Sequence, residues 1–294
     1  RMARNTKLLL KEESNVGRVV LTACGSWNAE SLTAEIAGAA WSLFGELESA
    51  GGILTALSDG TLASHIAAVR DARLARVATR KDPITGVSEF ADIGEAPLTR
   101  PEPDLRTLRS RAHEAASEVV LTGTPTECEP LPRIRWAQEF EALRDASDGY
   151  MAATGARPKV FLVNLGPVAV HTARATFAKN FFEAGGIEAV TSETGSTTGF
   201  DDPADAVRDV LAVGAHLVCL CSSDGVYAER AVEFARALSA AGLSPLYLAG
   251  NPGDRRDEET AAGITEFIHV GVDVLDVLRR AHEVVGTPSG VLAR

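Results

Sequence analysis

The spacing of apolar positions predicts a C-terminal region in which strands and helices alternate. Five short and almost continuously apolar stretches follow residue 158, with helically spaced apolar residues between them and after the last. The stretches are KVFLVNL (159–165), IEAVTS (187–192), HLVCLCS (216–222), PLYLAG (245–250) and EFIHV (266–270). Strands buried on both faces, with helices between them, are typical of a parallel sheet. We therefore predict an α/β domain over 158–294, a flavodoxin-like, doubly wound parallel sheet of five strands.

Two helices of this region carry clear terminal signals. Asp202 followed by Pro203 predicts a helix N-terminus, and Gly214 predicts the end of the same helix. The helix expected over 225–242 has four apolar residues on one face. They are Ala231, Phe234, Ala235 and Leu238.

The N-terminal region, 1–92, has a weaker pattern. GRVVLTAC (17–24) predicts a strand, and two helices are expected over 29–52 and 62–80, before the turn-rich KDPITGVSEF. The first helix has apolar residues at helical spacing and should end at a glycine pair. These residues are Leu32, Ile36, Leu43, Leu47, Gly51 and Gly52. One strand and two helices cannot close a core, so we expect the missing partners to lie upstream of Arg1.

Residues 93–157 are rich in proline, which is typical of an extended connector that wraps over other surfaces. Helices are expected within it over 104–120 and 134–153. The second helix places Trp136, Phe140 and Leu143 on one apolar face. The predicted organisation is thus 1–92, a connector over 93–157, and the parallel-sheet domain over 158–294.

Composition excludes several kinds of partner. Hydrophobic residues make up 45% and charged residues 23%, which is ordinary for a globular protein, and the formal net charge is −11. Nucleic acid and anionic membranes bind basic surfaces, so neither is an expected partner. No apolar run reaches the roughly 18 residues that suggest a membrane span. Cys219 and Cys221 lie two residues apart on a predicted strand, so their side chains share one face. We expect them to be buried free thiols in the reducing cytoplasm.

Familiar catalytic motifs are absent from the sequence. It contains no G-x-G-x-x-G after the first strand, no P-loop, no G-x-S-x-G and no H-E-x-x-H. A receiver domain would need acidic residues where the first strand ends in Asn164, Leu165 and Gly166. His171 is the histidine of interest, because it follows the first strand, at the edge where parallel sheets bind ligands. The histidines at 65, 113, 216, 269 and 282 form no cluster with metal-ligand spacing.

Several stretches together resemble the methylmalonyl-CoA mutases. RNTKLLLKEESNVGRVV, GSWNAESLT, AAWSLFGELESAGG and PITGVSEF are similar to the end of that family's (β/α)8 barrel domain. LPRIRWAQEFEALRDASD and ARPKVFLVNLGPVAVHTARATFAKNFFEAGGIEAV are similar to its connector and cobalamin-binding domain. The resemblance covers nearly the whole chain and is closest to the small subunit of heterodimeric bacterial enzymes. It implies that 1–92 is the last β/α part of a TIM-type barrel.

The resemblance also implies where a cobalamin site would lie. In the family's cobalamin-binding chains, a D-x-H-x-x-G motif after the first strand supplies the cobalt ligand, its hydrogen-bond partner and a close-contact glycine. Alignment on Gly166 and FFEAGG puts Val168, Val170 and Ala173 at those positions, with His171 one residue beyond the histidine. The family's second wall, a serine-containing loop and a glycine pair, leaves further vestigial candidates. These are Ser222 and Gly250, beside Ala249 in place of a glycine.

We therefore expect no catalytic residue, no metal ligand and no bound cofactor in this chain. The relatives commonly read D-P-A-x-G-S-W/Y where this chain has LTACGSW (21–27), so no barrel residue is carried over. The resemblance implies a non-catalytic small subunit beside a large subunit that holds adenosylcobalamin and interconverts (R)-methylmalonyl-CoA and succinyl-CoA. Two alternatives remain: a cobalamin-binding mutase chain with an atypical His171 site, and a stand-alone flavodoxin-like regulatory module.

Overall fold

A computed structural model describes residues 1–18, 23–96, 104–117 and 128–287. The chain divides into two compact units, which are described separately here. The first comprises Arg1–Ala67 and Val119–Leu131, and the second comprises Ala68–Glu118 and Pro132–Arg294. This division does not follow the three-part organisation expected from the sequence, which stays a prediction.

The first unit is helical in its described residues. Its elements are α1 (Met2–Glu12), the 3-10 helix η1 (Val16–Arg18), α2 (Trp27–Ser49), α3 (Gly52–Ser58) and the start of α4 (Thr61–Ala78). Ser26 caps α2 by accepting a hydrogen bond from the Ala29 amide. The helix ends at Ser49, just before Gly51, as the sequence predicts. Residues 19–22 of the strand expected over 17–24 lie outside the described residues. The described ones are not a strand, since Gly17 and Arg18 belong to η1 and residues 23–24 form a turn, and α1 and α3 were not predicted.

Large apolar side chains of α2 are exposed. Trp27 is 91% exposed, Ile36 60% and Trp41 74%, and Ala56 is the only buried residue among those described in the first unit. The helical apolar stripe expected from the sequence is therefore present, but the described residues of this unit do not cover it.

The second unit contains the predicted parallel sheet. Its strands are β1 (Lys159–Asn164), β2 (Glu188–Val190), β3 (Leu217–Cys221), β4 (Leu246–Ala249) and β5 (Ile264–Ile268). All neighbouring pairs are parallel, in the order β2-β1-β3-β4-β5. This order is that of a flavodoxin-like fold, so the fold expected for 158–294 is confirmed.

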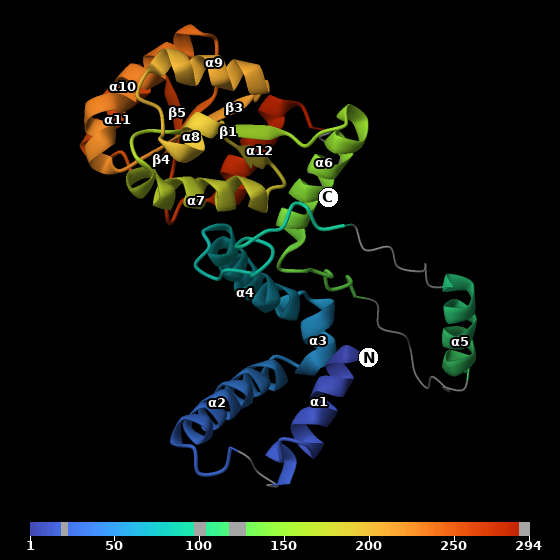
Figure 1. The fold of residues 1–294 in the computed structure, drawn as a ribbon. Coiled ribbons are helices and arrows are strands. Elements are labelled where there is room, and N and C mark those ends of the chain that lie inside the picture. The colour runs from blue at the N-terminus through green and yellow to red at the C-terminus, as the bar shows by residue number, and fades with distance from the viewer. Residues whose placement is uncertain (19–22, 97–103, 118–127, 288–294) are drawn as a thin grey trace. The chain divides into compact units, whose positions relative to one another are not determined.

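Helices cover both faces of this sheet (Figure 1). The helices from residue 138 onward are α6 (Gln138–Thr154), α7 (Val168–Ala184), α8 (Glu193–Thr197), α9 (Pro203–Val213), α10 (Asp224–Ala240), α11 (Arg256–Ala261) and α12 (Val274–Val285), with the 3-10 helix η2 (Gly253–Arg255) before α11. Helix α5 (Leu105–Ser117) contributes no residue to either core of the sheet. One core lies between the sheet and α6, α7 and α12, and a second lies between the sheet and α9 and α10. Alternate residues of β1, such as Leu162 and Val163, enter opposite cores, as the two-residue strand period requires.

The predicted helix ends and inner faces are confirmed in this unit. Asp202 caps α9 by accepting from the Ala204 amide at 2.8 Å, and Gly214 follows the helix with a left-handed φ of 68°. The four apolar residues expected on the inner face of α10 are fully buried. The helix expected over 104–120 corresponds to α5, and residues 118–120 lie outside the described part of the chain.

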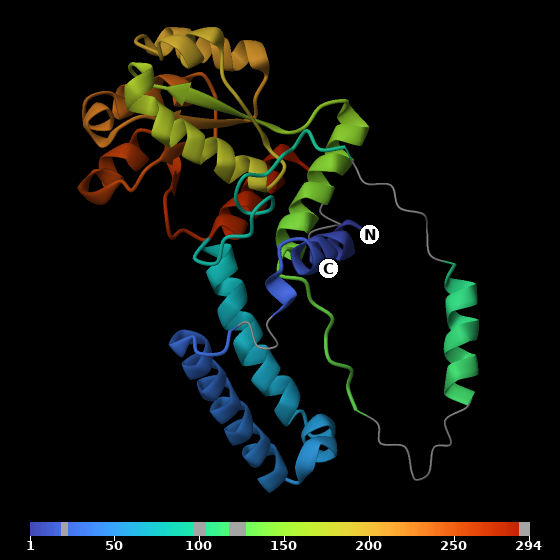
Figure 2. The ribbon, with the colours of Figure 1, turned by 60° about the horizontal axis from the view of Figure 1, so that its bottom comes forward.

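Helix α6 belongs to the core of the second unit. Phe140 and Leu143 have no exposed surface, and α6 packs against α12 (Figure 2). Arg144 donates to the carbonyl oxygens of Ala184, Gly86 and Val87 at 3.1, 3.1 and 2.6 Å. Two residues of the expected apolar face, Phe140 and Leu143, are therefore buried, whereas Trp136 precedes the helix and is only partly buried. Arg144 joins the segment around Gly86 to the end of α7.

Candidate functional site

The candidate site lies where β1, β3 and β4 end. The turn after β1 is short: Gly166 has a left-handed φ of 74°, Pro167 is the N-cap position, and α7 begins at Val168. From the sequence, a loop is expected between this strand and a helix that begins near His171. The three positions that the resemblance aligns with the D-x-H-x-x-G motif instead lie in the helix. They are Val168, Val170 and Ala173.

His171 is buried and bonded within its own turn. The residue is only 3% exposed, and its Nδ1 lies 2.9 Å from the Gly166 carbonyl oxygen. A carbonyl oxygen can only accept, so Nδ1 is the protonated nitrogen in this contact. The imidazole thus supplies a hydrogen-bond donor to a carbonyl oxygen of the turn between β1 and α7. From the sequence, His171 is expected to be either exposed or bonded locally, and the structure shows the local bond.

Ser222 is also hydrogen-bonded within the chain at the edge of the sheet. Its Oγ donates to the Leu165 carbonyl oxygen at 2.8 Å, and its N–H donates to Tyr227 Oη at 2.7 Å. Ser223, not Ser222, caps α10 by accepting from the Val226 amide. Ser222 is therefore a hydrogen-bond donor, as expected for a retained serine, but its acceptor is the neighbouring strand end.

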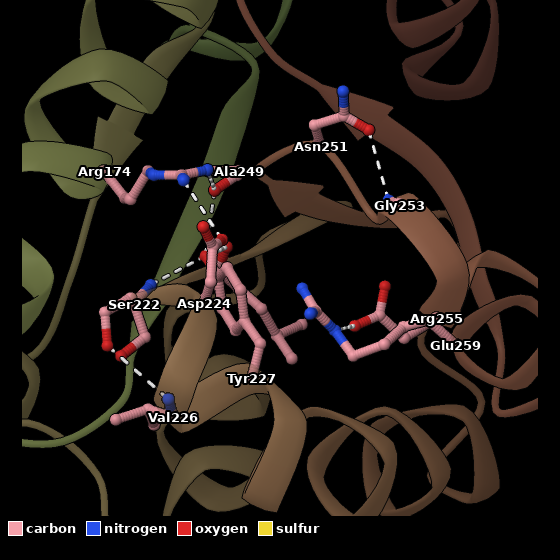
Figure 3. A network of polar contacts seen from close by, with 12 residues as sticks. Arg174, Ser222, Asp224, Val226, Tyr227, Ala249, Asn251, Gly253, Arg255 and Glu259 are labelled. Atoms are coloured by element: carbon pink, nitrogen blue, oxygen red, sulfur yellow. Dashed lines mark hydrogen bonds and ion pairs between the residues drawn. The ribbon is translucent and has the colours of Figure 1, made fainter.

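Tyr227 links β3 to β4 through hydrogen bonds of its hydroxyl to their backbones. Its hydroxyl oxygen lies 3.1 Å from the Leu220 carbonyl oxygen and 3.0 Å from that of Ala249, and it accepts from Ser222 (Figure 3). Tyr227 is 1% exposed. Burial raises the pKa of this phenol far above its ordinary value, with the nearby thiols of Cys221 and Cys219 adding to the rise. The hydroxyl therefore stays protonated, and its O–H remains available to donate to these carbonyl oxygens.

The two thiols of β3 are buried and free, as predicted. Cys221 Sγ lies 3.9 Å from Cys219 Sγ, and neither residue is exposed. Burial raises the pKa of Cys219 well above its ordinary value, so the thiol remains neutral and unreactive.

Arg174 lies across the end of β4. Its Nη1 donates to the Ala249 carbonyl oxygen at 2.7 Å, and its Nη2 pairs with Asp224 at 3.1 Å (Figure 3). A Cβ added at Gly250 would overlap Nη1 of Arg174. The glycine that the resemblance marks as a vestige of a cofactor channel is thus in contact with a guanidinium of the same chain.

These residues do not fit a cobalamin. The histidine position of the motif holds Val170, the aspartate position holds the exposed Val168, and His171 is bonded to Gly166 without a carboxylate partner. A metal-bound histidine ordinarily has such a partner on its second nitrogen. Tyr227 and Arg174 are hydrogen-bonded to backbone carbonyl oxygens at the ends of β3 and β4. Among the residues that the structure describes, no three histidine, cysteine or carboxylate side chains are grouped as metal ligands.

Sequence reasoning did not single out Arg174 or Tyr227. Arg174 is one helical turn beyond His171, and Tyr227 ends the stretch CSSDGVY, but nothing in the residue spacing indicates that both reach the end of β4. Their shared partner, the Ala249 carbonyl oxygen, is a backbone atom, and backbone acceptors leave no signal in a sequence.

Comparison with known proteins identifies relatives over almost the whole chain. The family model described as methylmalonyl-CoA mutase matches residues 1–145. The methylmalonyl-CoA mutase small subunit of Streptomyces virginiae is 43% identical over 278 residues, which are 95% of this chain and 40% of the relative. That of Propionibacterium freudenreichii subsp. shermanii is 36% identical over 97% of this chain and 41% of its own length. The chain spans about 40% of the length of such relatives.

The fold defines an α/β protein of the flavodoxin-like class. At the carboxyl ends of its strands, carbonyl oxygens accept hydrogen bonds from side chains of the same chain. Similarity along 95% of the chain makes the assignment more specific. The chain belongs to the methylmalonyl-CoA mutase family. In the described part of the chain, no helix is long and apolar enough to cross a membrane.

Proposed function

We propose that this chain acts as a non-catalytic small-subunit part of an adenosylcobalamin-dependent methylmalonyl-CoA mutase. The relatives that match most of the chain are named small subunits of that enzyme, which supports a large-subunit partner in a heterodimer. The assembled enzyme would interconvert (R)-methylmalonyl-CoA and succinyl-CoA in the cytoplasm. The role of this chain in that enzyme would be structural, through contact with the large subunit.

One observation carries the non-catalytic assignment: the polar side chains at the vestigial cobalamin positions are bonded to the chain's own backbone. His171 is bonded to Gly166, and Ser222 to Leu165. A cofactor site keeps polar groups available for its ligand. Adenosylcobalamin supplies the radical chemistry of such mutases and would be held by the large subunit, and no step of that chemistry is assigned to this chain.

The proposal predicts that His171 can be replaced without loss of turnover. The chain, in its full native context, is co-expressed with the large subunit, and the purified complex is assayed for mutase activity with His171→Ala. The kcat and the KM for adenosylcobalamin should stay within about twofold of the unsubstituted complex, because the imidazole only supports a turn. An atypical cobalt ligand at His171 would instead lower activity at least a hundredfold.

Two further results bear on the proposal. The large subunit should co-purify with this chain, whereas a stand-alone regulatory module would be recovered without it. His171→Asn keeps a side chain that can donate to the Gly166 carbonyl oxygen, and it serves as the control for any effect of the alanine on folding. A complex that is inactive with either substitution but folded would contradict the proposed role.

A further inference from the structure

A cavity beside Arg174 is not used by any interaction described above. It has a volume of about 420 Å³ and lies between α7, the turn after β4 and the residues that follow β5. Phe177 and Ile268 form apolar walls with Ala173 and Val270, while Arg174, Asn251 and His269 are its polar residues. Small-molecule sites commonly have this size and this combination of apolar walls with few polar groups. They also commonly lie at the carboxyl ends of parallel strands.

The polar residues of this cavity, the Arg174 cleft, have unused hydrogen-bond donors. A guanidinium carries five N–H donors, and Arg174 uses donors on its two terminal nitrogens for Ala249 and Asp224. The Asn251 side-chain oxygen accepts from the Gly253 amide at 3.2 Å, so its amide nitrogen is not engaged in that contact. Neither the Asn251 nitrogen nor the remaining Arg174 donors have a partner among the described residues.

His269 adds a third polar group to the same cleft. Its Nδ1 lies 3.0 Å from the Val270 carbonyl oxygen, so Nδ1 carries the proton and Nε2 is left for another partner. The carboxylate nearest to the guanidinium, Asp224, is paired with Arg174 and does not line the cavity. The cleft therefore presents a guanidinium and an amide donor next to apolar walls, with no carboxylate among its lining residues.

We propose that the Arg174 cleft binds a small organic carboxylate with an apolar body. The carboxylate would accept hydrogen bonds from Arg174 and Asn251, and the body would lie against Phe177 and Ile268. A guanidinium can bind a carboxylate through two parallel N–H donors, which favours a planar anion over a spherical one. The apolar walls favour an organic anion over inorganic phosphate. The site does not depend on the mutase assignment, because only residues of this chain form it.

The test is an NMR titration of the full chain with benzoate, using benzamide and inorganic phosphate as comparison ligands. Benzoate should shift the amide resonances of residues around Arg174, Asn251 and His269, with a dissociation constant on the order of 1 mM. Benzamide has the same shape without the charge and should bind at least tenfold more weakly, and phosphate should also bind at least tenfold more weakly. Equal binding of benzamide or phosphate would overturn the proposal.

Substitutions locate the interaction. Arg174→Gln should weaken benzoate binding at least tenfold, whereas Arg174→Lys, which keeps the charge, should lose less. Arg230→Gln is the matched control, because Arg230 is an arginine of α10 paired with Asp201 and does not line the cleft. Asn251→Ala provides a second test that leaves the contact of Arg174 with Ala249 intact. Unchanged benzoate binding in both Arg174→Gln and Asn251→Ala, or equal losses in Arg230→Gln, would contradict the proposal.

Discussion

Replacing Gly199 with alanine is expected to lower the free energy of unfolding of the second unit by roughly 3–5 kcal/mol. Gly199 has a left-handed φ of 76°, and an added Cβ would overlap the Gly166 carbonyl oxygen, which is a backbone atom. The same turn is fixed by the Phe200 amide, which donates to the Asn164 carbonyl oxygen at 2.7 Å. The alanine must therefore displace the backbone at the end of β1.

Gly214→Ala is the matched control for this substitution. Gly214 also has a left-handed φ, of 68°, but a Cβ there would have no neighbour within 4 Å. It should cost only the conformational strain, about 1–2 kcal/mol. The measurement is urea unfolding, read from the hydrogen-exchange protection of the β1 and β3 amides. Equal losses in the two variants would show that Gly199 does not contact the turn after β1 as described.

Replacing Phe140 with alanine should destabilise the second unit by about 3–5 kcal/mol, because it leaves a cavity in a packed core. Phe140 is fully buried in the same core as Phe181, Phe182 and Leu278. A helix of a connector that only lay on the surface would tolerate this change. Loss of 3–5 kcal/mol is a large share of the 5–15 kcal/mol that stabilises a typical domain.

Met151→Ala on the same helix is the control. Met151 is 37% exposed, and its truncation should change the unfolding free energy by no more than about 0.5 kcal/mol. Both variants are compared by the hydrogen-exchange measurement in urea. If Phe140→Ala also changed stability by less than about 1 kcal/mol, α6 would not be part of this core, and the domain would begin near residue 158 as expected from the sequence.

The sheet could be predicted because its sequence signal is local. Each strand is a short apolar run, and capping residues such as Asp202 and Gly214 act on neighbours within one turn. The inner face of α10 likewise follows from the helical period alone. The flavodoxin-like class was inferred from the alternation of strands and helices, and the observed strand order is the one that this class has.

The interactions at the sheet edge could be predicted only in part. The local hydrogen bond of His171 was one of two expectations for this side chain, the other being exposure, and Ser223 was one of two candidate caps of α10, with Asp224. The helical start at Val168 was missed, because the residues between the first strand and His171 were interpreted as a loop. The contacts of Arg174 and Tyr227 with Ala249 join residues 75 and 22 positions apart, and no pattern along the chain encodes them.

The carboxyl edge of this sheet lacks the groups that would hold cobalamin. The most direct test mixes the purified chain with hydroxocobalamin, removes free ligand by gel filtration and records the visible spectrum. We expect no retained corrinoid, because Val170 occupies the position of the histidine ligand and His171 is bonded to Gly166. Retained cobalamin with the spectrum of a histidine-ligated, base-off form would contradict the account.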